Sequence, residues 1–354
     1  MCIRDREQYY ETYLRGKNGE QKFYIDNVGR ISEIISSTDS VAGDDLYLSI
    51  DADLQKATYL ALQNEIAAIV YSNIKSGEIP INDVYTALIG NSVINTEHFS
   101  KAKASDTEKN VLSVFKSRQK TTLGKIKQEL TSSPEALNTM SDEVLDEFTY
   151  IISMLKDDQV LLKNEIDTSD SVYQKWKNQK ISPKEYLSYC ITQHWIDISQ
   201  LNVDEKYADS TEVYDALCKY ILKNIKTDTE FSKIIYQYMI TRGEISPRQL
   251  CLILFDQGVL DYDDATVNKL KNGSLSPRDF LMKKIYNIEI TPAQLALEPC
   301  TGSCVVTDEK TGEILAMVSY PGYDSNKLAN GVDSEYFASL QHDKSSPLLN
   351  YATQ

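Results

Sequence analysis

The chain has 354 residues, of which 37 are Lys or Arg and 52 are Asp or Glu, so its formal charge at pH 7 is −15. This acidic balance argues against nucleic acid as a partner, because proteins that bind phosphate backbones collect positive charge. Hydrophobic residues make up 42% and charged residues 25% of the chain. Such a composition excludes a wholly disordered protein, and the length allows two or three domains, each with its own core.

The first residues lack the features of a signal peptide. Met1 to Arg6 lead directly into polar sequence, and the chain has no apolar run long enough for a membrane span. Two interpretations stay open at this point: a cytosolic protein that starts at Met1, or a fragment whose membrane anchor lies upstream.

The N-terminal segment predicts a helix followed by a β-hairpin. Residues 7–14 have helical character, which ends in the stretch 15–19. Strand-like runs at 22–26 and 30–35 then flank Asn27-Val28-Gly29, a typical turn sequence.

A strand and a long helix are expected next. Leu46, Leu48 and Ile50 alternate with other residues as in a strand, and Asp51 is placed to cap a helix. The residues that this helix is expected to turn towards a core are Leu54, Ala57, Ala61, Ile66, Ile69 and Val70.

The span from Ser76 to Ile290 predicts a series of helices. A serine or threonine before a proline marks repeated helix starts, because the hydroxyl caps the helix and proline needs no N–H there. These starts are Ser133-Pro134, Ser182-Pro183, Ser246-Pro247, Ser276-Pro277 and Thr291-Pro292. Amphipathic runs are Leu145, Phe148, Ile151, Ile152 and Leu155, and Leu250, Leu252, Ile253, Leu254 and Phe255. We expect a helical domain with its own core. Shared capping chemistry explains the similar starts better than a repeat, because their spacings are unequal.

A second β-hairpin is predicted near the C-terminal end. Its strands are 303–307 and 313–319, and Gly312 supplies the positive φ that the turn 308–312 needs. The apolar residues of the strands are nearly continuous, which is typical of a sheet covered on both faces.

Cysteine and histidine are too scattered to form a metal site. The cysteines are Cys2, Cys190, Cys218, Cys251, Cys300 and Cys304, and the close pair Cys300 and Cys304 has no second pair or histidine beside it. We expect free buried thiols and no metal or cofactor. His98, His194 and His342 are far apart in sequence and are expected to be packed or solvated rather than catalytic.

Three stretches carry a resemblance to a known family. The first is YLRGK at 13–17 with Asp26 and Gly29-Arg30, and the second is AGDDLYLSIDADLQ at 42–55. The third is GSCVVTDEKTGEILAMVSYPGYDSN at 302–326, followed by PLLNYATQ at 347–354. Together and in this order they resemble class B penicillin-binding proteins, and segments such as 243–250 and 290–297 resemble an insertion of clostridial-type members.

The resemblance implies an α+β chain in four parts. Residues 1–45 resemble the end of the pedestal or dimerisation domain, and 46–75 the entry strand and helix of the transpeptidase domain. Residues 76–290 are then a helical insertion, and 291–354 the first sheet hairpin of the transpeptidase domain, whose sheet is of the serine β-lactamase type. One departure is Tyr351, where the family usually has arginine, so the polar contacts of that arginine are in doubt.

The family's nucleophile belongs to an S-x-x-K motif that follows the last of these stretches. The resemblance therefore implies a fragment that holds no catalytic residue and is inactive alone. The parent protein is implied to be a peptidoglycan D,D-transpeptidase, acylated on serine by stem peptides and by β-lactams. It is anchored by an N-terminal helix at the extracytoplasmic face of the cell membrane.

Three S-x-x-K strings within the chain need another explanation. Ser72 with Lys75, Ser113 with Lys116, and Ser117 with Lys120 all fall in helical sequence far from the sheet segments, so chance accounts for them. Lys310-Thr311-Gly312 matches another catalytic string of the family but precedes its expected position, and we interpret it as a turn.

Three other functions stay open. In the first, the helical domain is an interaction module without catalysis that docks proteins of cell-wall synthesis. In the second, the chain belongs to a transpeptidase-like β-lactam sensor. The segment before Asp51 argues against the sensor. A plain cytosolic helical protein is the remaining alternative.

Overall fold

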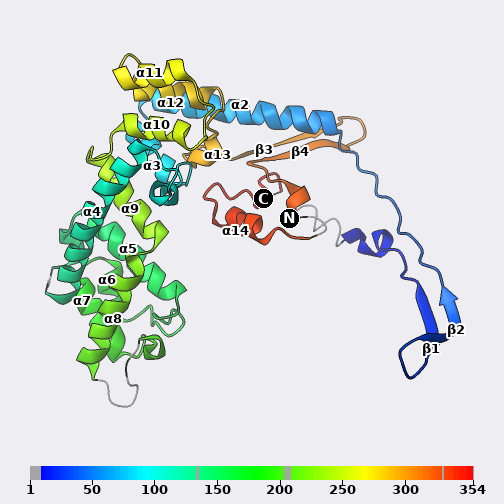
Figure 1. Ribbon diagram of the computed structural model, residues 1–354, viewed down its shortest axis with the longest axis horizontal. Coiled ribbons are helices and arrows are strands. Elements are labelled where there is room, and N and C mark those ends of the chain that lie inside the picture. Colours follow the sequence, from blue (N-terminus) through cyan, green and yellow to red (C-terminus); the bar gives the residue numbers. More distant parts are fainter. Residues whose placement is uncertain (1–8, 133–134, 202, 204–208, 329–330, 354) are drawn as a thin grey trace. The chain divides into compact units, whose positions relative to one another are not determined.

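The computed structural model describes residues 9–132, 135–201, 203, 209–328 and 331–353 (Figure 1). The chain is α+β, mostly helical with two small sheets, and divides into two compact units. Met1–Ser72 together with Ile285–Gln354 form one, which we call the terminal unit, and Asn73–Lys284 form the other, which we call the helical unit. Within the described ranges, none of the helices combines the length and the apolar character that a bilayer crossing requires.

The predicted N-terminal hairpin is confirmed. A helical turn at 9–14 precedes strand β1 (Glu20–Ile25), which pairs antiparallel with β2 (Ile31–Thr38). The turn between the strands is closed by Asp26, whose Oδ1 accepts the backbone N–H groups of Val28 and Arg30, both at 2.9 Å.

The strand predicted over 46–50 is wrong. The segment before Asp51 has no strand structure, and Leu46 and Leu48 are exposed. It touches strand β4 (Ile314–Tyr320) at two points: the Ser49 hydroxyl donates to the Ile314 carbonyl at 2.7 Å, and the Asp51 N–H donates to the Leu315 carbonyl at 2.9 Å. These two bonds do not make a ladder, so the alternation of apolar residues does not produce a strand.

Helix α2 (Ala52–Ser76) begins as predicted, because the Asp51 carboxylate accepts the Leu54 N–H at 2.8 Å. The predicted core face is right for Ile66 and Val70, which are buried, but wrong for Ala57, Ala61 and Ile69, which are exposed. The helix instead turns polar and aromatic side chains towards the hairpin. The Tyr59 ring lies 5.6 Å from that of Tyr320, and Gln55 bonds to the backbone of β4.

The predicted C-terminal hairpin is confirmed. Strand β3 (Gly302–Thr307) pairs antiparallel with β4, and Gly312 closes the turn with φ of 76°. Gly302 faces α2 so closely that a Cβ there would lie 3.2 Å from Ile66 Cδ1 and 3.3 Å from Leu62 Cδ1.

The prediction that both faces of this sheet are covered is wrong for the described residues. β3 alternates between half-buried and exposed side chains, and Val305 is 44% exposed. The reason is that β3 and β4 form a two-stranded sheet in the structure, packed against α2.

The remaining elements of the terminal unit are short. They are α13 (Pro292–Leu295), the 3₁₀ turn η4 (Ser325–Leu328) and α14 (Ser334–His342). At the far end of the segment, the Tyr351 N–H donates to the Ser319 hydroxyl at 2.9 Å, and that hydroxyl donates to the Leu349 carbonyl at 3.3 Å. These bonds attach the last described residues to β4. Near the other end of the unit, the rings of Tyr71 and Tyr286 lie 5.2 Å apart.

The helical unit consists of helices and short 3₁₀ turns. Its helices are α3 (Ile81–Gly90), α4 (Asp106–Thr131), α5 (Asp142–Asp157), α6 (Ser171–Lys177), α7 (Pro183–Thr192), α8 (Ser210–Ile225), α9 (Thr229–Thr241), α10 (Pro247–Asp256) and α11 (Asp264–Asn272), and α12 (Pro277–Tyr286) leads out of it. The 3₁₀ turns are η1 (Thr96–Ser100), η2 (Leu137–Thr139) and η3 (Ile198–Gln200).

The predicted caps are confirmed where they are described. Ser182, Ser246, Ser276 and Thr291 each accept a backbone N–H with the side-chain oxygen, three residues ahead. Ser133-Pro134 lies outside the described residues. The amphipathic runs also point inward as predicted: Phe148, Ile151 and Leu155 of α5 and Leu250, Ile253 and Leu254 of α10 are buried.

The similarity between these helix starts extends back through the preceding turn. Many helices end at a residue with positive φ, and an apolar residue follows two positions later. The residues with positive φ are Gly77, Ser92, Gln159, Gln179, His194, Gly243, Gly258 and Gly273. Their apolar followers Ile79, Ile94, Leu161, Ile181, Ile196, Ile245 and Leu260 are buried. A left-handed residue is a common helix stop, and the buried residue two positions later fixes the direction in which the chain leaves the helix.

The core of the helical unit lies between α3, α4, α9 and α10. The Tyr236 ring stacks on Phe115 with centroids 4.2 Å apart and meets Phe99 edge-on at 5.9 Å. Around this core, tyrosine hydroxyls donate to aspartates of other helices or turns. The pairs are Tyr150 with Asp228, Tyr189 with Asp170, Tyr220 with Asp158, and Tyr238 with Asp146, at 2.6 to 2.9 Å. These pairs join an apolar ring to a polar contact, a role that suits the abundance of tyrosine in the chain.

Candidate functional site

The serine and lysine pairs of the S-x-x-K strings lie on helix surfaces. Ser72 and Lys75 are on α2, and the other two pairs are on α4; all six side chains are exposed. An acyl-transfer site needs a nucleophile hydrogen-bonded to its base in a place that excludes water. The exposed positions do not provide it.

Lys310-Thr311-Gly312 is a turn in the structure. The Asp308 carboxylate accepts the N–H groups of Lys310 and Thr311, both at 2.8 Å, and these bonds lower the pKa of Asp308. The string therefore serves to close the β3–β4 hairpin.

Four of the five cysteines that the structure describes are buried. Cys190, Cys218, Cys251 and Cys300 are buried and free, and Cys304 is half-buried. Burial raises the pKa of the Cys190 and Cys251 thiols to about 12, so they stay protonated and poorly nucleophilic at neutral pH. Cys2 lies outside the described residues. Across the described ranges, no three His, Cys, Asp or Glu side chains are grouped so as to hold a metal ion.

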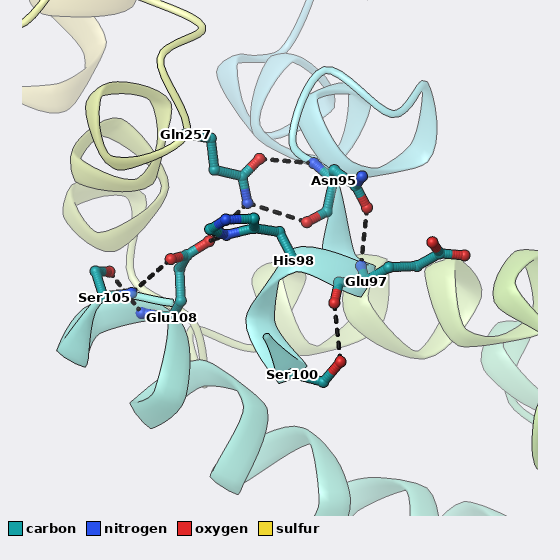
Figure 2. Close-up of polar contacts among 7 residues, drawn as sticks. All are labelled: Asn95, Glu97, His98, Ser100, Ser105, Glu108 and Gln257. Carbon is teal, nitrogen blue, oxygen red and sulfur yellow. Dashed lines mark hydrogen bonds and ion pairs between the residues drawn. The ribbon is translucent and has the colours of Figure 1, made fainter. Parts of the chain in front are cut away.

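A polar network around Glu108 brings together charged and polar side chains of the helical unit (Figure 2). The Glu108 side chain has no solvent exposure, and its Oε1 lies 2.7 Å from His98 Nδ1. Gln257 Nε2 donates to the same oxygen at 2.8 Å, and the Ser105 N–H donates to Glu108 Oε2 at 2.7 Å. Gln257 also exchanges two hydrogen bonds with the backbone of Asn95, at 2.9 and 3.0 Å.

Local sequence explains how each member reaches this network. Ser105 and Glu108 form a capping box at the start of α4, and Asn95 caps η1 by accepting the Glu97 N–H at 2.9 Å. Gln257 ends α10. The network thus connects η1, α4 and α10 through one carboxylate.

Hydrogen bonding decides the charge of Glu108. Burial by itself raises the pKa of a carboxyl group, but the bonds from Gln257, Ser105 and His98 outweigh burial and lower the pKa of Glu108 below its usual value. Glu108 is therefore a carboxylate that orients the His98 ring. The network contains no hydroxyl or thiol held against His98, so its arrangement suits structural cohesion rather than nucleophilic catalysis.

One part of this network has a recognisable sequence signal, and the rest does not. The S-x-x-E spacing of Ser105 and Glu108 is a recognisable capping box. The contacts with His98 and Gln257 depend on tertiary packing, since Gln257 is 149 residues from Glu108. His98 was expected to be packed or solvated, and the structure packs it against Glu108 with 28% of its side chain exposed.

In the terminal unit, a cleft of about 510 Å³ lies beside the Tyr59 ring. Its walls include Ser319 from β4, Tyr323 from the chain after β4, and Tyr336 from α14. The Tyr336 hydroxyl accepts the Asp324 N–H at 2.8 Å, which fixes this wall. The predicted segment 320–326 therefore folds back against α14 and α2.

Comparisons with known proteins give one family model and several relatives. The family model described as "Penicillin-binding Protein dimerisation domain" matches residues 7–48. Peptidoglycan D,D-transpeptidase MrdA of Escherichia coli (strain K12) is 48% identical over 50 residues, which is 14% of this chain and 8% of that protein.

Two further relatives carry the same description. Peptidoglycan D,D-transpeptidase FtsI of Escherichia coli (strain K12) is 34% identical over 106 residues, 30% of this chain and 17% of that protein. Peptidoglycan D,D-transpeptidase PbpA of Mycolicibacterium smegmatis is 47% identical over 57 residues, 15% of this chain and 12% of that protein. The matches thus span less than a fifth of these relatives. No solved structure matches the chain.

The match over residues 7–48 and these relatives support a penicillin-binding protein. More narrowly, they support a class B penicillin-binding protein, the family that the sequence motifs resemble.

Proposed function

We propose that the chain is part of a peptidoglycan D,D-transpeptidase that cross-links stem peptides through an acyl-serine intermediate. In this proposal residues 1–354 hold the end of the pedestal, the first elements of the transpeptidase domain and a helical insertion. The nucleophile lies outside them. The S-x-x-K serines of this chain are exposed on helices, which supports its inactivity alone.

One observation carries the assignment of parts. Gln55 and Met317, 262 residues apart, exchange two hydrogen bonds of 2.7 Å between the Gln55 side chain and the Met317 backbone. The second and third motif stretches therefore pack as one substructure, although the helical unit separates them in sequence. This is the arrangement expected if the helical unit interrupts a transpeptidase domain.

A non-catalytic role of the helical unit is a second candidate. Its favouring observation is a core of its own, centred on Phe115 and Tyr236. In this reading the unit docks other proteins of cell-wall synthesis. The parent protein is placed by our proposal at the extracytoplasmic face of the membrane.

Labelling with a fluorescent penicillin tests the proposed function. Purified residues 1–354 are expected to remain unlabelled, because acylation requires a serine activated by a neighbouring base. The product of the complete reading frame is expected to be labelled in intact cells, at a serine outside residues 1–354.

One control variant makes the result decisive. Triple replacement of Ser72, Ser113 and Ser117 by alanine is expected to leave labelling of the complete product unchanged. Acylation of any serine within residues 1–354 contradicts the proposal, and so does a complete product that the fluorescent penicillin does not label.

A further inference from the structure

One carboxyl group of the helical unit is buried without a full set of partners. Glu147 on α5 is 1% exposed, and its Oε1 has no hydrogen-bond partner. A carboxylate without its hydrogen bonds is strongly disfavoured in such a place, because nothing replaces the water it has lost.

Charged groups on or next to three helices face Glu147. Glu143 and Asp146 lie on its own helix, Lys125 lies on α4, and Arg242 follows directly after α9. Arg242 is already occupied, because its guanidinium makes two parallel bonds to the Glu143 carboxylate, one of them at 2.9 Å. Burial first, and the Glu143 charge second, raise the pKa of Glu147 from 4.5 to about 8. Glu147 is therefore a neutral acid at neutral pH.

Neighbouring contacts leave little freedom for rearrangement. Asp146 accepts the Tyr238 hydroxyl of α9 at 2.6 Å, and Arg118 of α4 pairs with Glu244 just after α9. On the α8 side, Tyr220 bonds to Asp158 at the far end of α5. These pairs tie α5 to α8 and α9, and α4 to the residue Glu244 after α9, and none of them includes Glu147.

We propose that Glu147 is a proton-controlled latch between α5 and α9. With its proton, the carboxyl group packs as a neutral group, and the two helices stay closed. When the proton passes to solvent, the charge that remains on Glu147 faces the Glu143 carboxylate, and the junction loosens. The latch concerns the helical unit alone and does not depend on the proposed transpeptidase function.

The direction of the pH effect follows from proton linkage. Between pH 4.5 and about 8 the folded chain holds a proton on Glu147 that the unfolded chain has released. Each pH unit in this window therefore lowers the folding constant by up to roughly tenfold, and the loss levels off above the upper limit. The helical unit is most stable at mildly acidic pH.

Urea unfolding of the full chain tests the latch. The two tryptophans of the chain, Trp176 and Trp195, both lie in the helical unit and report its unfolding by fluorescence. The wild-type midpoint is expected to fall from pH 5 to pH 8. The Glu147→Gln variant, which keeps the shape of the neutral acid, is expected to lose most of this fall.

Asp157→Asn is the matched control, because Asp157 is an exposed carboxylate on the same helix. Its midpoint is expected to follow the wild-type pH dependence. Parallel curves for wild type and Glu147→Gln overturn the latch, and so does a control that loses the dependence equally.

Two further measurements on the wild-type chain keep the test independent of the variant. The carbon-13 NMR shift of the Glu147 carboxyl is expected to titrate near pH 8, and titration near pH 4.5 overturns the proposal. Hydrogen exchange, corrected for intrinsic rates, is expected to show protection of α5 and α9 amides falling from pH 6 to pH 9. Unchanged protection in these two helices also overturns it.

Discussion

At the scale of single residues, Glu108 shows how one carboxylate serves local and distant structure together. It accepts the Ser105 N–H of its own helix start and also bonds His98 and Gln257 of other elements. Because its side chain is fully buried, removing it leaves several donors without an acceptor. The network is therefore expected to contribute more to stability than an ordinary helix cap.

The Glu108→Ala variant is expected to lower the free energy of unfolding of the helical unit by roughly 2–4 kcal/mol at pH 7, since it removes a cap and unpairs buried donors. Tryptophan-monitored urea unfolding measures this. Glu97→Ala, at an exposed position of η1, is expected to change it by less than about 0.5 kcal/mol. Equal losses in both variants would show that the network adds nothing.

Glu108 is also expected to make the stability of the helical unit sensitive to acid. The pKa of Glu108 is lowered in the folded state. Its contribution to folding stability is therefore fully present above the pKa of the unfolded state, and is lost as the pH falls through the pKa of the folded state. This window lies below that of Glu147, whose effect has the opposite sign. Glu108→Gln is expected to reduce the loss at acidic pH.

At the scale of elements, caps and turns were predictable, and docking was not. Ser246 before Pro247, or Gly312 in its hairpin, act through neighbours in sequence, so the pattern alone determines them. The segment 46–50 has the alternation of a strand but meets β4 at only two hydrogen bonds. The face of α2 that packs also depends on the distant hairpin. Apolar content alone therefore predicted wrongly that Ala57 and Ile69 are buried.

Gln55 takes the place of a neighbouring strand at β4. Its amide donates to and accepts from the Met317 backbone, which satisfies both polar groups of that residue. Gln55→Leu is expected to leave them unpaired at a cost of about 1–3 kcal/mol. Hydrogen exchange at the Met317 amide measures this as a loss of protection.

Asn64→Leu is a suitable comparison, because Asn64 is exposed on the same helix and its side-chain amide donates to the Leu60 carbonyl one turn earlier, at 2.8 Å. It is expected to leave the Met317 amide protected. A Met317 amide that exchanges equally slowly in Gln55→Leu would mean that water replaces the side chain at no cost.

At the scale of the whole molecule, the two units differ in how they reach stability. The helical unit has its own core of stacked aromatic and aliphatic side chains, while the terminal unit has small sheets and a half-exposed face on β3. The sequence indicated a helical span from Ser76 to Ile290 but not the packing of its helices, because helix pairing depends on contacts between distant residues.

Limited proteolysis of the full chain is expected to leave the helical unit as the resistant piece, because its backbone is buried in packed helices. Mass spectrometry of the fragments measures this. A resistant fragment from the C-terminal hairpin, with loss of the helices, would contradict the expectation.

The ring pair of Tyr71 and Tyr286 bears on how the helical unit is joined to the rest of the chain. These residues flank the helical unit in sequence, and their rings lie 5.2 Å apart, so the chain leaves the terminal unit and returns to it at nearly one point. Closing a gap of this size takes only a short connection, and the cost of a longer one grows with the logarithm of its length. We therefore expect that a short connection in place of the helical unit leaves the contacts between α2 and the β3–β4 hairpin intact.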